Sequence, residues 1–175
     1  MSFIGHITQG LYNKILKKLA EISASPQSIA AGFATGVAVS FTPFVGFHLL
    51  IALVITRIFQ QNSVAAALGT ISGNPWTFPP IWYLTWYTGA FLTHLPLSTF
   101  PTDFIPYFKE LFHALIMLDF KVFISDIWPI YYPMLVGCIP WVIMVWLFVY
   151  HILKHSLQSN QQQIRGRIND FRNRV

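Results

Sequence analysis

The sequence predicts an all-α integral membrane protein, and three observations lead to that prediction. The hydrophobic fraction is 54%, only 10% of the residues are charged, and the mean hydropathy is +0.53, whereas soluble domains carry about 25% charged residues. Between Gln27 and Thr102 the one formal charge is Arg57, which is too little to cover a soluble fold. Proline and glycine interrupt the apolar segments, so we expect broken, partly re-entrant helices beside one clear transmembrane span and amphipathic interfacial helices.

Both termini are basic and are expected to lie on anionic phospholipid headgroups. Residues 1–22 read as an amphipathic interfacial helix, with apolar residues at spacings of three and four and lysines near the other face. Packing of this helix on other protein is the alternative. The tail, residues 156–175, is also basic, and the nearby membrane is a better partner for it than nucleic acid.

The membrane domain, residues 23–155, contains two broken apolar segments, 28–59 and 63–93. Each half is too short to cross a hydrocarbon core of about 30 Å, so at least one segment is expected to re-enter. Their similar layout resembles the duplicated broken helices of transporters. The residues expected to make the breaks are prolines and glycines: Pro43, Gly46, Gly73, Pro75, Pro79 and Pro80.

The remaining segments set the expected orientation. Residues 94–129 carry four acidic and two basic residues and are expected to form an external interfacial region. Residues 130–153 form the clearest transmembrane helix. The positive-inside rule puts both termini in the cytoplasm of a multi-pass inner-membrane protein. The two broken segments must then supply an odd number of crossings, and 28–59 is favoured as re-entrant because this keeps Arg57 cytoplasmic.

Five residues are candidate substrate-binding residues, four near the breaks and Arg57 at a segment end: His48, Arg57, Asn74, Thr77 and Thr42. An intramembrane histidine is a functional candidate, although a neutral His48 bonded to a freed carbonyl is equally compatible. Arg57 can bind a lipid phosphate or simply extend to the headgroups. Asn74, Thr77 and Thr42 can coordinate a polar group beside broken backbone, where helix N-termini attract anions, or only cap their own helix ends.

The sequence does not predict a catalytic or metal site. It contains no GxSxG, HExxH or GxxxxGK[ST] string, and its single cysteine, Cys138, excludes a disulfide framework. We therefore expect no catalytic residue, metal or cofactor, and an enzyme acting on lipid-linked substrates ranks third among the hypotheses. The small residues of the first segment can serve an internal contact or a homo-oligomer contact.

Three strings carry a family resemblance: AGFATG at 31–36, TPFVGFH at 42–48, and GT at 69–70 with NPWTFPP at 74–80. They resemble the bacterial family catalogued as domain of unknown function 2062, over about residues 15–155. The resemblance implies a small bacterial inner-membrane protein. Some members are fused to glycosyltransferases, which implies envelope or lipid-linked sugar metabolism. No established activity comes with the resemblance.

Two functions are therefore expected as alternatives. The first is a carrier or flippase for an anionic lipid or lipid-linked envelope precursor, with its site at the broken helices. The second is a non-transporting scaffold or accessory protein for an envelope glycosyltransferase or a related envelope-biosynthesis enzyme. In the second case the breaks serve only packing.

Overall fold

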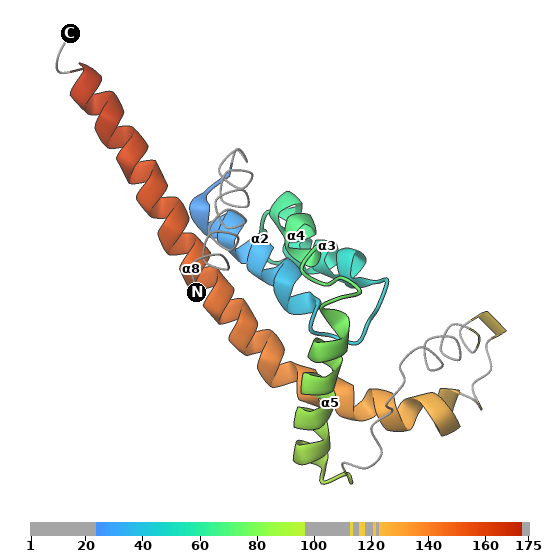
Figure 1. The fold of residues 1–175 in the computed structure, drawn as a ribbon. Helices are drawn as coiled ribbons and strands as arrows, with labels where there is room; N and C mark the ends of the chain where they lie inside the picture. The colour runs from blue at the N-terminus through green and yellow to red at the C-terminus, as the bar shows by residue number, and fades with distance from the viewer. Residues whose placement is uncertain (1–23, 97–112, 114–115, 118–120, 122, 173–175) are drawn as a thin grey trace.

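The computed structural model describes residues 24–96, 113, 116–117, 121 and 123–172, and Figure 1 shows their arrangement. These described residues form five α-helices: α2 (Pro26–Val39), α3 (His48–Ile58), α4 (Ser63–Thr70), α5 (Phe78–Thr93) and α8 (Trp128–Arg172), the last preceded by a π-helical turn, η2 (Phe123–Ile127). No strand occurs among the described residues, which confirms an all-α fold there. The interfacial helix expected at 1–22 and most of the region 94–129 lie outside the described residues.

The helix α8 is the element on which α2 and α5 pack, while α3 and α4 pack on α2 and on each other. Its segment Trp128–Ser159 is the one stretch among the described residues that is long and apolar enough to cross a membrane. Pro133 and Pro140 lie inside the helix without ending it. The helix also continues beyond the expected end of the span at residue 153, through the basic tail to Arg172. The span and the tail therefore differ in residue composition, but both belong to one continuous helix.

The helices α2 and α3 form an antiparallel hairpin. The Asn62 amide donates to the Ser28 carbonyl at 3.1 Å, and the Thr35 hydroxyl donates to Gln61 Oε1 at 2.6 Å. These bonds place the end of α3 beside the beginning of α2. The Trp146 indole N–H donates to Thr35 Oγ1 at 3.0 Å and fixes the hairpin to α8.

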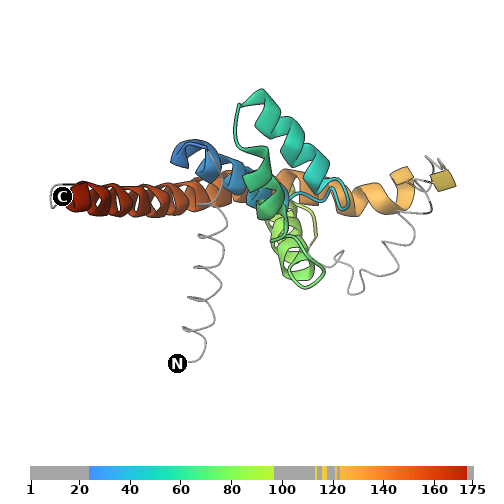
Figure 2. The ribbon, with the colours of Figure 1, turned by 90° about the horizontal axis from the view of Figure 1, so that it is seen from above.

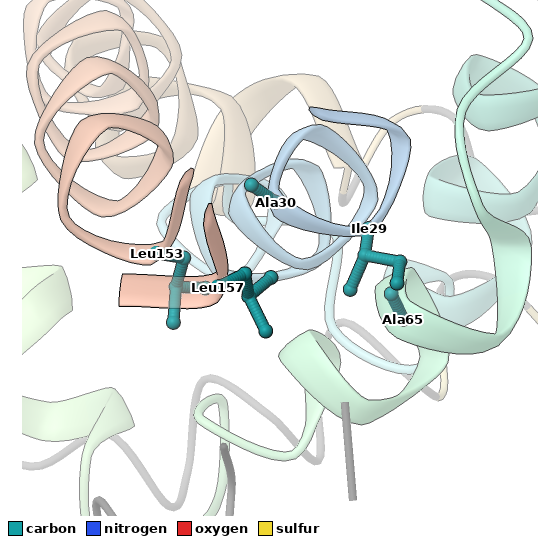
Figure 3. Packing of buried hydrophobic residues seen from close by; sticks show 5 residues of the cluster. All are labelled: Ile29, Ala30, Ala65, Leu153 and Leu157. Atoms are coloured by element: carbon teal, nitrogen blue, oxygen red, sulfur yellow. The ribbon is translucent and has the colours of Figure 1, made fainter. Parts of the chain in front are cut away.

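The helix α4 lies along α2 in the same direction, and α5 then leaves to cross α8 (Figures 1 and 2). At the end of α2 near residue 29, Ile29 and Ala30 pack with Ala65 of α4 and with Leu153 and Leu157 of α8 (Figure 3). At the other end of the bundle, Trp82 and Trp86 of α5 pack on Met134 of α8.

Glycines permit the two closest helix approaches. Gly36 of α2 and Gly69 of α4 lie against each other's backbone, and so do Gly89 of α5 and Gly137 of α8. A Cβ on any of these four residues would overlap backbone atoms of the facing helix. Small residues at helix crossings are typical of membrane proteins, because close packing replaces the hydrophobic drive that lipid cannot supply.

The described side chains are distributed as a lipid environment demands. Alanines dominate the buried set, together with the polar residues Ser40, His48, Thr35, Thr56 and Thr85. Large apolar side chains are instead exposed on α3, α4, α5 and α8, including Leu50, Ile58, Phe91, Ile143 and Phe148. A soluble protein rarely exposes such a continuous apolar surface. The distribution adds to the evidence of α8 that the chain is associated with a membrane.

Candidate functional site

The candidate site is formed by the two loops that interrupt the helices. Loop 1 (residues 40–47) joins α2 to α3, and loop 2 (residues 71–77) joins α4 to α5. Each loop opens with three successive tight turns, at Ser40 to Thr42 in loop 1 and at Ile71 to Gly73 in loop 2, where each amide donates to the carbonyl three residues earlier. The loops share one plan, and loop 2 is one residue shorter.

The two loops also enter their following helices in the same way. The residues before α3 and α5, Phe47 and Thr77, both have right-handed helical backbone and no side-chain cap. The helix α5 begins at Phe78 and includes Pro79 and Pro80 in its first turn, so these two prolines begin the helix instead of lying in the break to which the sequence assigned them. Proline is tolerated there because first-turn amides have no partner within the helix.

Loop 1 and loop 2 lie against each other. Gly73 of loop 2 approaches Ser40 so closely that a Cβ at residue 73 would be 2.7 Å from Ser40 Oγ. The His48 ring, at the start of α3, stacks on Phe78 at the start of α5, with centroids 5.4 Å apart. Phe78 in turn stacks on Trp82 at 5.2 Å. We call this meeting point of the loops and the starts of α3 and α5 the loop junction.

Tyr131 attaches the loop junction to α8. Its hydroxyl donates to the Pro43 carbonyl at 2.7 Å, and its ring contacts Phe44 edge-on at 6.3 Å. In the sequence, Tyr131 lies at one end of the apolar span, where an aromatic belt is common, and its contact with loop 1 was not predicted. A tyrosine in a belt and a tyrosine that binds a freed carbonyl have the same sequence context, so no signal in the sequence could separate them.

The polar side chains of loop 2 bond to the loop's own backbone. Asn74 Oδ1 accepts from the Trp76 amide at 3.0 Å and the Thr77 amide at 3.2 Å. Thr77 Oγ1 accepts from the Asn74 amide at 2.9 Å and donates to the Ser72 carbonyl at 2.7 Å. The two side chains thus satisfy each other's backbone groups, as in a capping box.

Loop 1 is stabilised by its own hydroxyls and by His48. Thr42 Oγ1 donates to the Val39 carbonyl at 2.7 Å, and Ser40 Oγ donates to the Gly36 carbonyl at 3.1 Å. His48 Nε2 lies 3.1 Å from the Thr42 carbonyl oxygen. Gly46 has φ of +85°, a conformation that favours glycine. Freed backbone in loop 1 therefore also has partners within the chain.

The structure brings four of the five candidate binding residues to the two loops. Thr42 and His48 belong to loop 1 and its exit, and Asn74 and Thr77 belong to loop 2. Arg57 lies apart from them, exposed in the last turn of α3. An α-helix rises about 1.5 Å per residue, so the length of α3 separates Arg57 from His48. Whether these five residues bind a substrate remains a prediction.

The loop junction places a few hydrogen-bonding side chains among apolar ones. It offers hydroxyls, an amide and an imidazole, all near backbone dipoles. Among the described residues, no three His, Cys, Asp or Glu side chains gather as metal ligands do. These groups can hydrogen-bond a polar headgroup, and protonated His48 can pair with an anion.

Comparison with known proteins identifies a family. A family model described as "Uncharacterized protein conserved in bacteria (DUF2062)" matches residues 11–165. No curated protein and no solved structure gives a significant match. The matched range includes loop 1 and loop 2.

Proposed function

The chain belongs to this uncharacterised bacterial family, and from that premise we propose that it is a small inner-membrane carrier or flippase for an anionic lipid or lipid-linked envelope precursor. The observation that carries the proposal is the loop junction, where two helix interruptions of the same plan lie side by side. Transporters commonly place substrate at interrupted helices within duplicated units, because broken backbone supplies oriented dipoles inside the membrane.

The helix directions support the topology that we propose. The α2–α3 hairpin enters from the cytoplasm and returns, α4 and α5 together cross, and α8 brings the chain back. Both termini are then cytoplasmic, and the loop junction lies inside the membrane. The lengths support this proposal, because α2, α3 and α4 have 14, 11 and 8 residues, while a single helical crossing needs about 20.

Cysteine labelling in intact cells is expected to reveal this topology. The background is Cys138→Ser, which removes the single native thiol, and the single reporters replace Gln27, Gln60, Leu95 and Ser159. An impermeant maleimide should label only the reporter at residue 95, because the other three lie on the cytoplasmic side. Labelling at residue 60 in intact cells would mean that the first segment crosses, and the re-entrant hairpin would be wrong.

Arg57→Gln is expected to slow transport without lowering the amount of protein. Arg57 is exposed at the end of α3 and is the one formal charge between Gln27 and Thr102, so we propose that it captures the phosphate of the lipid before the headgroup reaches the loop junction. The measurement is the flux of a fluorescent anionic lipid in vesicles containing the purified protein. Arg57→Lys should retain more flux than Arg57→Gln, and equal flux in all three proteins would count against the role.

A scaffold without transport activity is the second candidate, and one observation favours it. The polar side chains of both loops already bond to the chain's own backbone, as a purely structural break requires. A scaffold predicts no lipid flux above protein-free vesicles, together with recovery of an envelope glycosyltransferase or related enzyme during mild purification. Flux above protein-free vesicles that depends on the loop junction would exclude the purely structural role.

A further inference from the structure

His48 is the ionisable residue of the loop junction, and its neighbours determine which ring nitrogen carries the proton. Its Nε2 lies 3.1 Å from the Thr42 carbonyl oxygen. A carbonyl oxygen can only accept a hydrogen bond, so Nε2 must carry a proton and donate. In the neutral ring, Nδ1 is then unprotonated and is the position that a second proton would occupy. The residue is buried, with 7% of its surface exposed.

The ring of His48 contacts both loop 1 and α5. One edge belongs to loop 1 through Thr42, and one face stacks on Phe78 of α5 at 5.4 Å with an interplanar angle of 27°. Phe78 continues the stack to Trp82, which packs on Met134 of α8. A change at His48 therefore affects the contact between loop 1 and α5.

The groups around His48 are mostly uncharged. The helices α2 and α4 carry no titratable side chain, and the tyrosines of α5, Tyr83 and Tyr87, are exposed at 54% and 46%. On α3 the other ionisable group is Arg57, at the opposite end of the helix. From α8, Tyr131 approaches loop 1 with its hydroxyl on the Pro43 carbonyl. None of these described groups supplies a negative charge that would pair with an imidazolium.

We propose that His48 is a proton-operated latch between loop 1 and α5. The neutral ring holds loop 1 next to the start of α5, because it bonds to Thr42 of loop 1 and stacks on Phe78 of α5. A second proton on Nδ1 places a full charge in a buried apolar position, which is strongly unfavourable without a partner. The charge is relieved when water or an anion reaches Nδ1, so we expect the His48 ring to leave its stack on Phe78 and loop 1 to open with it. This inference does not depend on transport, because it concerns the opening of the loop junction itself.

Hydrogen exchange of the full-length protein in lipid nanodiscs tests the latch. Exchange of the loop 1 amides is measured by mass spectrometry at about pH 7.5 and about pH 5 and divided by the intrinsic exchange rate at each pH. In the wild type the normalised rate should rise about tenfold on acidification, since one linked proton can shift an opening equilibrium by up to tenfold per pH unit. Equal normalised rates at the two pH values would overturn the proposal.

The variant His48→Gln tests the effect of protonation separately from the effect of the hydrogen bond to Thr42. The glutamine amide can still donate to the Thr42 carbonyl, but it cannot take up a proton. Its normalised exchange should be the same at both pH values. The matched control is His151→Gln, because His151 lies exposed on α8 and bonds the Leu147 carbonyl of its own helix. That variant should respond to acid as the wild type does. An acid response that persists in His48→Gln would refute the latch.

A second variant keeps the test decisive where His48→Gln does not fold. Phe78→Leu retains His48 and its bond to Thr42 but removes the aromatic ring that covers the imidazole face. Water then reaches the ring more readily, so opening should occur at a higher pH than in the wild type. A purely structural role of the stack predicts faster exchange at every pH with no shift of the transition, and that result would also refute the latch.

Discussion

Replacing Gly89 by leucine is expected to destabilise the membrane domain more than any other single change considered. The Cβ at residue 89 would overlap the Pro133 carbonyl of α8, and the reciprocal contact at Gly137 meets the Thr85 carbonyl of α5. Overpacking a dense core costs about 1–3 kcal/mol. Here the obstacle is backbone, which a change of rotamer cannot relieve, so we expect the upper end of that range. The measurement is thermal unfolding of the purified protein in detergent.

The control for Gly89→Leu is Phe91→Leu on the same helix. The Phe91 side chain is 72% exposed, so its replacement should leave the melting temperature nearly unchanged. Gly89→Ala should lie between the two variants, because it adds the Cβ without the longer side chain. Equal melting temperatures for wild type and Gly89→Leu would show that α5 and α8 do not approach as closely as the structure indicates.

The positions of the two interruptions were predictable because they follow from local backbone chemistry. Proline lacks an amide donor and glycine permits φ of +85° at residue 46, so the strings around Pro43 and Pro75 could not continue a helix. The same reasoning missed the start of α5, where Pro79 and Pro80 lie in the first turn. Proline disrupts a helix in its interior but is tolerated in its first turn. The sequence does not say where the first turn begins.

The contacts of the loop junction were not predictable, because they join segments far apart in the chain. Tyr131 meets Pro43 across 88 residues, and the Ser40–Gly73 contact depends on the parallel packing of α2 and α4. Trp76 illustrates the same limit. Its side chain is 90% exposed on loop 2, and its place in an apolar segment does not predict this exposure.

For Thr42, Asn74 and Thr77 the sequence allowed either substrate binding or capping of nearby backbone, and the structure gives information on the capping. Thr42, Asn74 and Thr77 cap the backbone beside them, as the capping alternative expects. Capping does not exclude binding, because a side chain that holds freed backbone is also close to any headgroup that reaches it. Variants that remove a cap from the loop junction must therefore be compared with variants that remove a cap elsewhere.

Asn74→Ala is expected to lower both stability and lipid flux. The change removes the oxygen that accepts from the Trp76 and Thr77 amides, and each lost hydrogen bond costs about 0.5–1.5 kcal/mol. Under the proposed function it also disorders loop 2 at the substrate position. We expect flux per folded molecule to fall about tenfold, equivalent to about 1.4 kcal/mol of lost interaction. The measurements are thermal unfolding and lipid flux in reconstituted vesicles at equal amounts of folded protein.

Asn62→Ala is the matched control, because it removes the same kind of cap from a different place. Asn62 Oδ1 accepts from the Ala65 amide at 2.8 Å at the start of α4, on the loop between α3 and α4 and away from the loop junction. Its stability loss should be similar, and its flux per folded molecule should be that of the wild type. If both variants lose stability and both keep wild-type flux, the Asn74 side chain is structural and the site must lie elsewhere. If neither the wild type nor either variant transports lipid, the flippase is excluded and the scaffold becomes the function to test.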